Sequence, residues 1–418
     1  MLNIDYKIGL YGFAYINECR KGENMIILVV GNGFDLAHGL PTKYKHFLNF
    51  VNIYRGNEYQ DIKDEEEVKI YKQQKMFVEK LKAGKDKIAI EFKTLIEEKN
   101  ALLYYFLDVY TSRCQNGKEG WIDFESELAE IVKLFDASYQ YILKKEEKGE
   151  DNTLSNLLSW RLEPFICYGT DLPRGALYSS SSNDLYELAN KYLQDLNKIS
   201  RLLELYLKVF VESIETNIRI PEIYDRCRKA DAVLSFNYTD TYRRLYRGTE
   251  MIECCFIHGK AKEECNLINN SNLVLGINEY LDTNRSNNDN VFIWFKKFYQ
   301  RIYKETDSQY IDWINDDIED NKKKNEKIPF YIYFYGHSLD ITDKDILQKL
   351  ILYDNAKIRI FYHEKKEMGK QIANLTKIIG EENLIHMTRG RDRKIEFIPA
   401  SKAINEALCK ISTKKIVH

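Results

Sequence analysis

An unbroken apolar run at residues 26–30, Ile-Ile-Leu-Val-Val, places the strongest constraint on how this chain folds. Such a run suits a β-strand that is covered on both faces, as strands are in a parallel sheet flanked by helices. It is followed at once by residues 31–35, Gly-Asn-Gly-Phe-Asp, and then by the pattern of a helix. A buried strand, a glycine turn and a helix in this order predict an α/β protein with the turn at the carboxyl end of a parallel sheet.

Strand-like runs return in the C-terminal half of the chain and alternate with helical ones. This alternation predicts a Rossmann-like core with a right-handed, mostly parallel sheet. Helical patterns occupy residues 343–352 and 365–379. The expected strands are residues 232–236, 252–257, 273–275, 330–335 and 357–362, with a weaker one at 384–385.

The stretch between the first strand and this second half is helical in pattern and contains no run typical of a central strand. Its clearest helix carries apolar residues at alternating spacings of four and three from Leu185 to Phe210. A second helix, at residues 123–143, has a comparable apolar stripe, and we expect the two to pack as an antiparallel pair. An intermolecular coiled coil is the alternative, which the short length of the pattern disfavours.

A smaller insertion interrupts the second half of the chain. Residues 282–329 are rich in Asn, Asp and Lys around an aromatic centre, and we expect them to form a lid. The expected segments are an N-terminal extension without assigned function (1–24), a core (25–60 with 231–400), a helical insertion (61–230), this lid, and a C-terminal tail (401–418).

Charge and hydropathy argue against several functional classes. The 62 Lys and Arg residues are balanced by 64 Asp and Glu residues, for a formal net charge of −2. No global basic field is available to gather phosphate backbones, so nucleic-acid binding is unsupported. The apolar stretch at residues 8–16 is too short to span a bilayer and makes a poor signal peptide, so no membrane segment is expected.

The cysteine pattern indicates a reducing environment. The eight cysteines include no C-x-x-C pair. Cys254 and Cys255, followed by His258 and Cys265, lack the paired spacing of a structural zinc site. We therefore expect reduced thiols, a cytoplasmic location and no metal cofactor.

Three polar clusters come directly after expected strands, in addition to the glycine turn. They are residues 237–240 (Asn-Tyr-Thr-Asp), 258–259 (His-Gly) and 336–338 (Gly-His-Ser). Because the carboxyl ends of parallel strands meet in one crevice, we expect these clusters to lie together. Taken singly, each has a structural explanation as a helix cap, a satisfied ring at a strand end, or a turn.

Other polar residues fit structural roles better than chemical ones. The carboxylates of residues 123–130 fall in the first turns of a helix, where the helix dipole favours them. His38 and His46 bracket a helix and are interpreted as packing or surface residues. The aspartates of residues 340–345 have the spacing of cap and turn residues rather than of a calcium loop.

The long run at residues 31–42, with Tyr44 and Phe47, closely resembles the opening signature of the bacteriophage abortive-infection family AbiH. Later blocks are similar as well, so the resemblance spans residues 25 to about 380. It implies a role in bacterial antiphage defence. The later blocks are Trp121 with Asp123-Phe124-Glu125, Ser235 to Asp240, His258-Gly259, and Gly336 to Asp340.

The order of these motifs is also similar to that of sirtuin-like (DHS-like) proteins, which have a G-A-G turn, a T-x-N-x-D block, an H-G pair and a late G-x-S. This resemblance implies NAD as ligand or substrate, with Asn237 and His258 as catalytic residues that flank the nicotinamide ribose. The residues implied to hold the dinucleotide are Gly31, Asn32, Gly33, Phe34, Asp35, Asp240, Gly259, Gly336, His337 and Ser338.

The chain departs from the sirtuin-like pattern in four respects. Asn32 replaces alanine, Asp35 stands where sirtuins have serine, and Asp240 is shifted by one position. Paired zinc cysteines are absent, which favours hydrolysis of NAD over protein deacylation. In that reaction Asn237 would hold water and ribose hydroxyls, and His258 would accept a proton.

Two other functions remain open. One is a nucleotide sensor that binds without turnover, and the other is a metal-dependent nuclease effector using Asp123, Glu125 and Asp240. For the NAD-hydrolysing effector we expect a phage-derived trigger that is sensed through the helical insertion. We expect its activity to be controlled by a homo-oligomer or by a rearranged lid.

Overall fold

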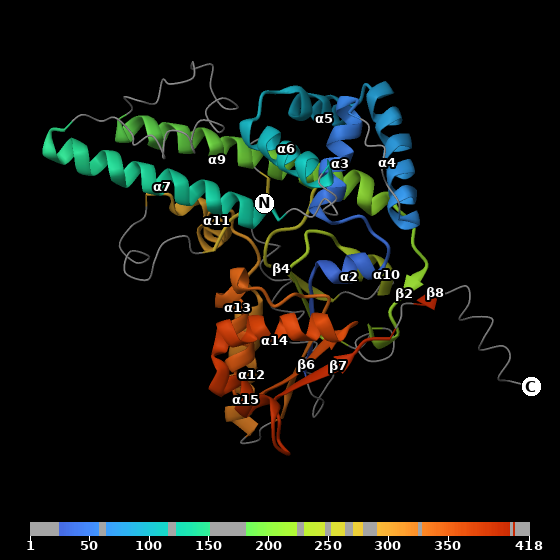
Figure 1. The fold of residues 1–418 in the computed structure, drawn as a ribbon. Helices are drawn as coiled ribbons and strands as arrows, with labels where there is room; N and C mark the ends of the chain where they lie inside the picture. The colour runs from blue at the N-terminus through green and yellow to red at the C-terminus, as the bar shows by residue number, and fades with distance from the viewer. Residues whose placement is uncertain are drawn as a thin grey trace, which may run out of the picture.

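The computed structural model describes residues 25–57, 64–115, 123–150, 181–223, 230–246, 252–263, 271–278, 291–324, 328–401 and 404–405. Its centre is a six-stranded sheet in which all neighbouring strands are parallel (Figure 1), so the predicted α/β class is confirmed. The strands are β1 (Ile26–Val30), β3 (Ala232–Ser235), β4 (Glu253–Phe256), β5 (Phe330–Tyr335), β6 (Ala356–Tyr362) and β7 (Ile395–Pro399).

The strand order β4-β3-β1-β5-β6-β7 explains where a ligand site can form. The chain enters the sheet at β1, moves outward to β3 and β4, and then returns across the sheet to β5. The connections that leave β1 and β5 therefore turn away from each other, which opens a crevice at the carboxyl ends of these strands. This is the strand order of doubly wound, Rossmann-like folds.

Both faces of the sheet are buried, which accounts for the unbroken apolar run of β1. Ile27 and Val29 belong to one core, and Leu28 and Val30 belong to the other. The first core is covered by α12 (Tyr310–Lys324), α13 (Lys344–Leu352), α14 (Lys365–Ile379) and α15 (Glu381–Thr388), and the second by α2 (Asn32–Ala37) and α10 (Thr241–Tyr246).

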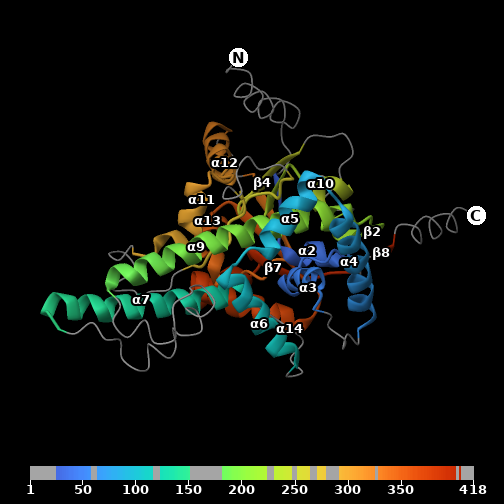
Figure 2. The same cartoon turned by 90° about the horizontal axis from the view of Figure 1, so that it is seen from above.

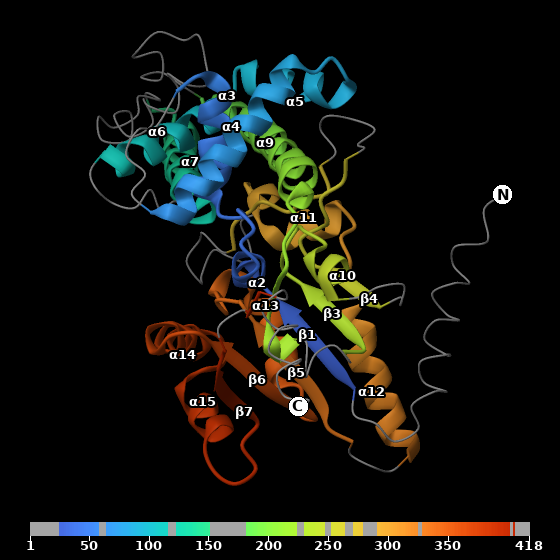
Figure 3. The same ribbon diagram turned by 90° about the vertical axis from the view of Figure 1, so that its right-hand side faces the viewer.

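The helices between β1 and β3 form a third core that lies over the end of the sheet toward which β1 points (Figure 3). Leu273, Phe292 and Phe295 join this core from the second half of the chain, so the helical part and the sheet pack together. None of the described helices is long and apolar enough to cross a membrane. The helices are α3 (Tyr44–Arg55), α4 (Glu65–Ala83), α5 (Lys87–Glu97), α6 (Ala101–Gln115), α7 (Phe124–Lys148) and α9 (Ser182–Leu205), which continues as a π-helix (Tyr206–Phe210).

Helices α7 and α9 lie side by side and extend away from the rest of the molecule (Figures 1 and 2). Helix α9 begins with a capping box in which Ser181 and Asp184 bond each other's backbone N–H groups. Ser182, at this end of α9, donates its backbone N–H to Glu146 near the C-terminus of α7 at 2.9 Å. The predicted antiparallel pair is therefore confirmed, although α7 is longer than predicted.

Two predicted strands are wrong, and one strand of the six-stranded sheet was missed. Residues 273–275 are extended but form no strand, because Val274 donates its N–H to the carbonyl of His258 and Leu275 donates to the side chain of Gln300. Residues 384–385 lie inside helix α15. Two adjacent apolar residues fit a helix as well as a strand, whereas the true edge strand β7 has the alternating sequence Ile-Glu-Phe-Ile-Pro.

Residues 282–290 and 325–327 of the segment expected to form a lid lie outside the described residues, and the described part divides between two locations. Helix α12 packs on the sheet through Trp313, whose ring N–H donates to Glu253 on β4 at 2.8 Å. Helix α11 (Lys297–Tyr303) contacts the helical part instead, through the ion pair of Lys297 with Glu125 on α7. A short antiparallel pair, β2 (Ile218–Arg219) with β8 (Ile404–Asn405), was not predicted.

The turns that follow β1 and β5 are in direct backbone contact. Gly33 donates its N–H to the carbonyl of Gly336 at 2.8 Å. A Cβ atom on Gly33 would lie 2.7 Å from Cα of Gly336, and one on Gly336 would lie 2.2 Å from the nitrogen of Phe34. Gly336 also has a φ of 64°, in the left-handed region that favours glycine. The glycines are thus explained by the packing of one turn on the other.

Replacing Gly336 by alanine should therefore be costly. We expect Gly336→Ala to lower the free energy of unfolding by about 2–3 kcal/mol, because it combines backbone strain with a steric clash. Gly369→Ala is the matched control, since Gly369 lies in helix α14 and a Cβ there meets nothing within 4 Å. The free energy of unfolding of that control should rise by about 0.5–1 kcal/mol, as measured by denaturant unfolding. Equal effects of the two substitutions would contradict the packing described here.

Candidate functional site

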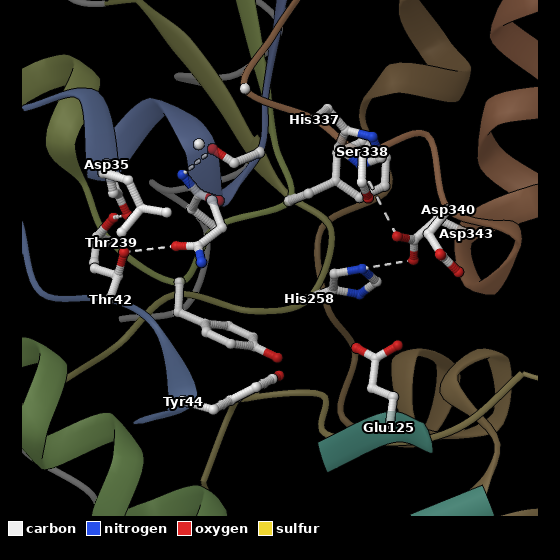
Figure 4. A pocket seen from close by; sticks show the side chains of 18 of the residues that line it. Asp35, Thr42, Tyr44, Glu125, Thr239, His258, His337, Ser338, Asp340 and Asp343 are labelled. Carbon is white, nitrogen blue, oxygen red and sulfur yellow. Dashed lines mark hydrogen bonds and ion pairs between the residues drawn. The ribbon is translucent and has the colours of Figure 1, made fainter. Parts of the chain in front are cut away.

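A cavity of about 430 Å³ lies at the carboxyl ends of the central strands (Figure 4). Its volume is within the range of small-molecule sites. Turns after β1, β3, β4 and β5 supply most of its wall, and α7, α9 and α11 close it from the helical side. The lining residues are Gly31, Asn32, Gly33, Asp35, Leu36, Thr42, Tyr44, Asp123, Glu125, Leu203, Leu207, Phe236, Asn237, Tyr238, Thr239, His258, Lys297, Gly336, His337, Ser338, Asp340, Thr342 and Asp343.

Asp35 and Thr239 lie together on one side of the cavity (Figure 4). The Thr239 hydroxyl donates to Oδ2 of Asp35 at 2.6 Å, whereas Oδ1 is buried and has no partner among the described residues. Burial raises the pKa of Asp35 to about 6, and the hydroxyls of Thr239 and Thr241 only partly offset this effect. Asp35 is thus a carboxylate that loses its proton near neutral pH.

His258, His337 and Asp343 form a cluster on the opposite side. His258 Nε2 lies 2.9 Å from Oδ1 of Asp343, and His337 Nε2 lies 3.9 Å from Oδ2 of the same carboxylate. An ionised carboxylate only accepts hydrogen bonds, so Nε2 of His258 carries the proton. Its Nδ1 is then an acceptor, and this atom is buried without a partner among the described residues.

His337 is held in one tautomer by its own turn. Its Nδ1 accepts the backbone N–H of Leu339 at 2.9 Å, so Nε2 carries the proton and faces Asp343. Leu339 has a φ of 55°, which is strained for a leucine and places that N–H toward the ring. Burial lowers the pKa of His337 to about 4 and also lowers the pKa of His258. Both rings are therefore neutral at pH 7.

Lys297 connects this cluster to the helical part. Its Nζ lies 2.8 Å from Oε2 of Glu125 on α7 and 3.2 Å from Oδ1 of Asp343. Burial opposes the charge of Asp343, but Lys297 and the two histidines hold the pKa of Asp343 well below its usual range. Burial raises the pKa of Glu125 to about 7, although Lys297 lowers it. One lysine thus stabilises two carboxylates from different parts of the fold.

Asn237 supports the glycine turn rather than pointing freely into the cavity. Its side-chain Nδ2 donates to the carbonyl of Gly31 at 2.9 Å. The N–H groups of Gly31, Gly33 and Phe34 are also engaged, with Tyr335, Gly336 and Gly31 respectively. The turn is consequently rigid, and these three N–H groups are already used within the protein.

The structure brings most of the sequence-predicted site residues to one cavity and leaves three outside its lining. Phe34 belongs to the core beneath the turn. Asp240 pairs with Lys260 at 2.5 Å. Gly259, with a φ of 83°, packs so closely that a Cβ would lie 1.9 Å from the carbonyl oxygen of Asn272. The predicted residues that line the cavity are Gly31, Asn32, Gly33, Asp35, Asn237, His258, Gly336, His337 and Ser338.

Several lining residues were missed by sequence reasoning or assigned only a structural role. Asp340 does cap a short helix, because its Oδ1 accepts the N–H of Thr342 at 3.0 Å. Asp343, three residues later, instead pairs with His258, and its position after the Gly-His-Ser turn was the available signal. Asp123 caps α7, yet Glu125 in the same turn reaches Lys297. No local sequence pattern around Lys297 indicated that it belongs to the site.

The remaining sequence candidates are structural. His38 is buried and lies 2.6 Å from the carbonyl of Phe34 through Nδ1. His46 is also buried and pairs with Glu67. The carboxylates considered for a nuclease site do not all meet, since Asp240 faces Lys260 outside the cavity lining. Within the described ranges, no three His, Cys, Asp or Glu side chains are placed to hold a metal ion.

A parallel sheet in this strand order, with a polar cavity at the carboxyl ends of four strands, defines a Rossmann-like α/β protein. Comparison with known families then identifies the family. Residues 27–363 match the family described as bacteriophage abortive infection AbiH, and the chain belongs to that family. Membership implies a role in abortive infection by bacteriophage. No curated protein and no solved structure matches the chain.

The shared lysine makes the stability of this site depend on pH. In Lys297→Met, Glu125 and Asp343 lose their common cation, and we expect unfolding at pH 8 to require about 3 kcal/mol less than for wild type. A carboxylic acid whose folded pKa is raised loses stability as the pH rises from its unfolded pKa to its folded pKa, so a further rise of the folded pKa in the variant adds a cost only above about pH 7, the folded pKa of Glu125 in wild type. The deficit should therefore shrink at pH 5.5, where Glu125 is protonated.

The double variant Lys297→Met/Glu125→Gln tests the same pair. In denaturant unfolding at pH 8 it should recover the part of the loss that comes from Glu125, because that carboxylate is gone and only Asp343 still lacks its cation. A deficit that is independent of pH and is not rescued by Glu125→Gln would contradict this account of the site.

Proposed function

We propose that this AbiH protein is an antiphage effector that binds NAD in the cavity and hydrolyses the bond between nicotinamide and ribose. The observation that carries the proposal is the pairing of His258 with Asp343 at the crevice of a Rossmann-like sheet. The pairing leaves a neutral ring nitrogen of His258 as an acceptor at the cavity wall.

The reaction adds water to C1′ of the nicotinamide ribose. The bond from C1′ to the pyridinium nitrogen breaks, its electron pair leaves with neutral nicotinamide, and one proton from water is released. Positive charge develops on the ribose in the transition state. Carboxylates placed around the ring before the reaction stabilise that charge, and Asp35 and Glu125 are available for this purpose.

His258 is the residue we assign to the proton. Asp343 orients the ring and fixes the proton on Nε2, and burial keeps the ring neutral by lowering its pKa. Nδ1 then accepts a proton or hydrogen bond from the attacking water or from a ribose hydroxyl. Asp343 thereby acts as a positioning residue for His258, and Lys297 in turn holds Asp343.

Asn237 and the glycine turn provide the floor of the proposed site. Because Asn237 fixes the carbonyl of Gly31, it sets how closely the ribose approaches the turn. Most N–H groups of the turn already donate to backbone carbonyls. Side chains such as Asn32 and Ser338 therefore make the contacts to the dinucleotide.

Control by the helical part follows from the position of Glu125. This carboxylate belongs to the first turn of α7, which extends away from the sheet together with α9 (Figure 2). A phage-derived trigger or a second copy of the chain that moves α7 would change the contact of Glu125 with Lys297. Resting activity would then be low until the trigger binds.

The direct test is nicotinamide release from NAD by purified protein, with and without lysate from phage-infected cells. Wild type should consume NAD, and His258→Ala and Asn237→Ala should each reduce the rate by about 100-fold or more. His386→Ala is the control, because this histidine is exposed on α15 away from the cavity lining.

The outcomes separate the candidate functions. Tight binding of NAD without turnover under every condition would replace the hydrolase by a nucleotide sensor. Activity that survives in both variants would remove the assigned residues from the mechanism. Absence of both binding and turnover would reject NAD as the ligand.

A further inference from the structure

Two buried acceptor atoms on opposite sides of the cavity lack partners within the described part of the chain. They are Oδ1 of Asp35, a residue 1% exposed, and Nδ1 of His258, a residue 4% exposed. An unpaired buried polar atom destabilises a protein, and native structures contain few of them. Since both residues line the same cavity (Figure 4), a ligand with hydrogen-bond donors is the natural partner of both atoms.

Asp35 differs from an equally buried structural aspartate of this protein. Asp195, which is 4% exposed, accepts the backbone N–H groups of Ala101 and Leu102 through Oδ2 at 2.7 and 3.4 Å, and neither of its oxygens is a buried atom without a partner. Asp35 accepts a hydrogen bond from the Thr239 hydroxyl through Oδ2, while its Oδ1 is buried and has no hydrogen-bond partner among the described residues.

The charges around the cavity indicate what kind of ligand fits. Lys297 is the single lysine or arginine among the described lining residues, and it is already paired with Glu125 and Asp343. Both lining histidines are neutral at pH 7, because burial lowers the pKa of each. The lining carboxylates are Asp35, Asp123, Glu125, Asp340 and Asp343. A phosphate inside this cavity would meet net negative charge, whereas a cation would be attracted.

We propose that the cavity takes the cationic riboside end of its ligand and that Asp35 selects it. Oδ1 of Asp35 accepts a hydrogen bond from a ribose hydroxyl or base amide on one side, and His258 accepts one on the other. The anionic pyrophosphate lies outside the carboxylate-lined part. This inference rests on the proposed NAD chemistry and specifies which half of the dinucleotide the cavity recognises.

The test is calorimetric titration with two probes that separate charge from phosphate. Nicotinamide riboside is a cation without phosphate, and ADP-ribose carries the phosphates without the cationic base. Wild type should bind nicotinamide riboside, and excess ADP-ribose should displace it only weakly. Asp35→Asn replaces the free acceptor by a donor and should weaken riboside binding at least 10-fold.

The control and a second readout keep a folding defect apart from a binding defect. Asp231→Asn is the control, since Asp231 accepts the N–H of Ile26 at the opposite end of β1 and should leave binding unchanged. The melting temperature of Asp35→Asn should be unchanged or higher than that of wild type at pH 8, because a buried charge is removed. A lower melting temperature would indicate that the carboxylate serves the fold.

The remaining outcomes distinguish this inference from the proposed hydrolysis. Riboside binding that depends on Asp35 without any NAD turnover would support the inference and reject the hydrolysis. NAD turnover with no measurable riboside binding, or with equal binding by wild type and Asp35→Asn, would overturn the inference alone.

Discussion

The contact between the turns after β1 and β5 is the constraint on which the rest of the site depends. Gly33 and Gly336 approach so closely that neither position has room for a side chain, and the carbonyl of Gly31 is fixed from the other side by Asn237. Only when these two turns are locked together do Asp35 and His337 reach the same cavity from neighbouring strands. The strand order places the crevice, and the glycine contact forms part of its wall.

Electrostatics then couples the two halves of the chain. Lys297 is buried between Glu125 of α7 and Asp343, which follows β5. The helical part is therefore held to the carboxyl edge of the sheet by ion pairs as well as by apolar packing. Removing either partner leaves an uncompensated buried charge, which is far costlier than removing both. A signal received along α7 therefore has a physical route to His258 through Asp343.

Sequence reasoning was most successful where a pattern is local. Short sequence patterns predicted the apolar run of β1, the glycine turn and the regularly spaced apolar residues of α9. The polar clusters after the strands could be placed together because parallel strands share a carboxyl edge. The roles of Lys297 and Asp343 depend on tertiary contacts between segments far apart in the chain, and no spacing rule reports such contacts. The glycines were expected to hold the dinucleotide, whereas their immediate neighbours are each other's backbones.

The most direct test of the central claim is a crystal structure of His258→Asn with NAD, a variant that keeps a polar side chain but lacks the basic ring nitrogen to which the proton is assigned. The account predicts electron density for the nicotinamide ribose in the cavity, with a hydrogen-bond donor at Oδ1 of Asp35 and the pyrophosphate toward Asn32 and Ser338. An empty cavity at saturating NAD, or NAD bound elsewhere on the molecule, would contradict it.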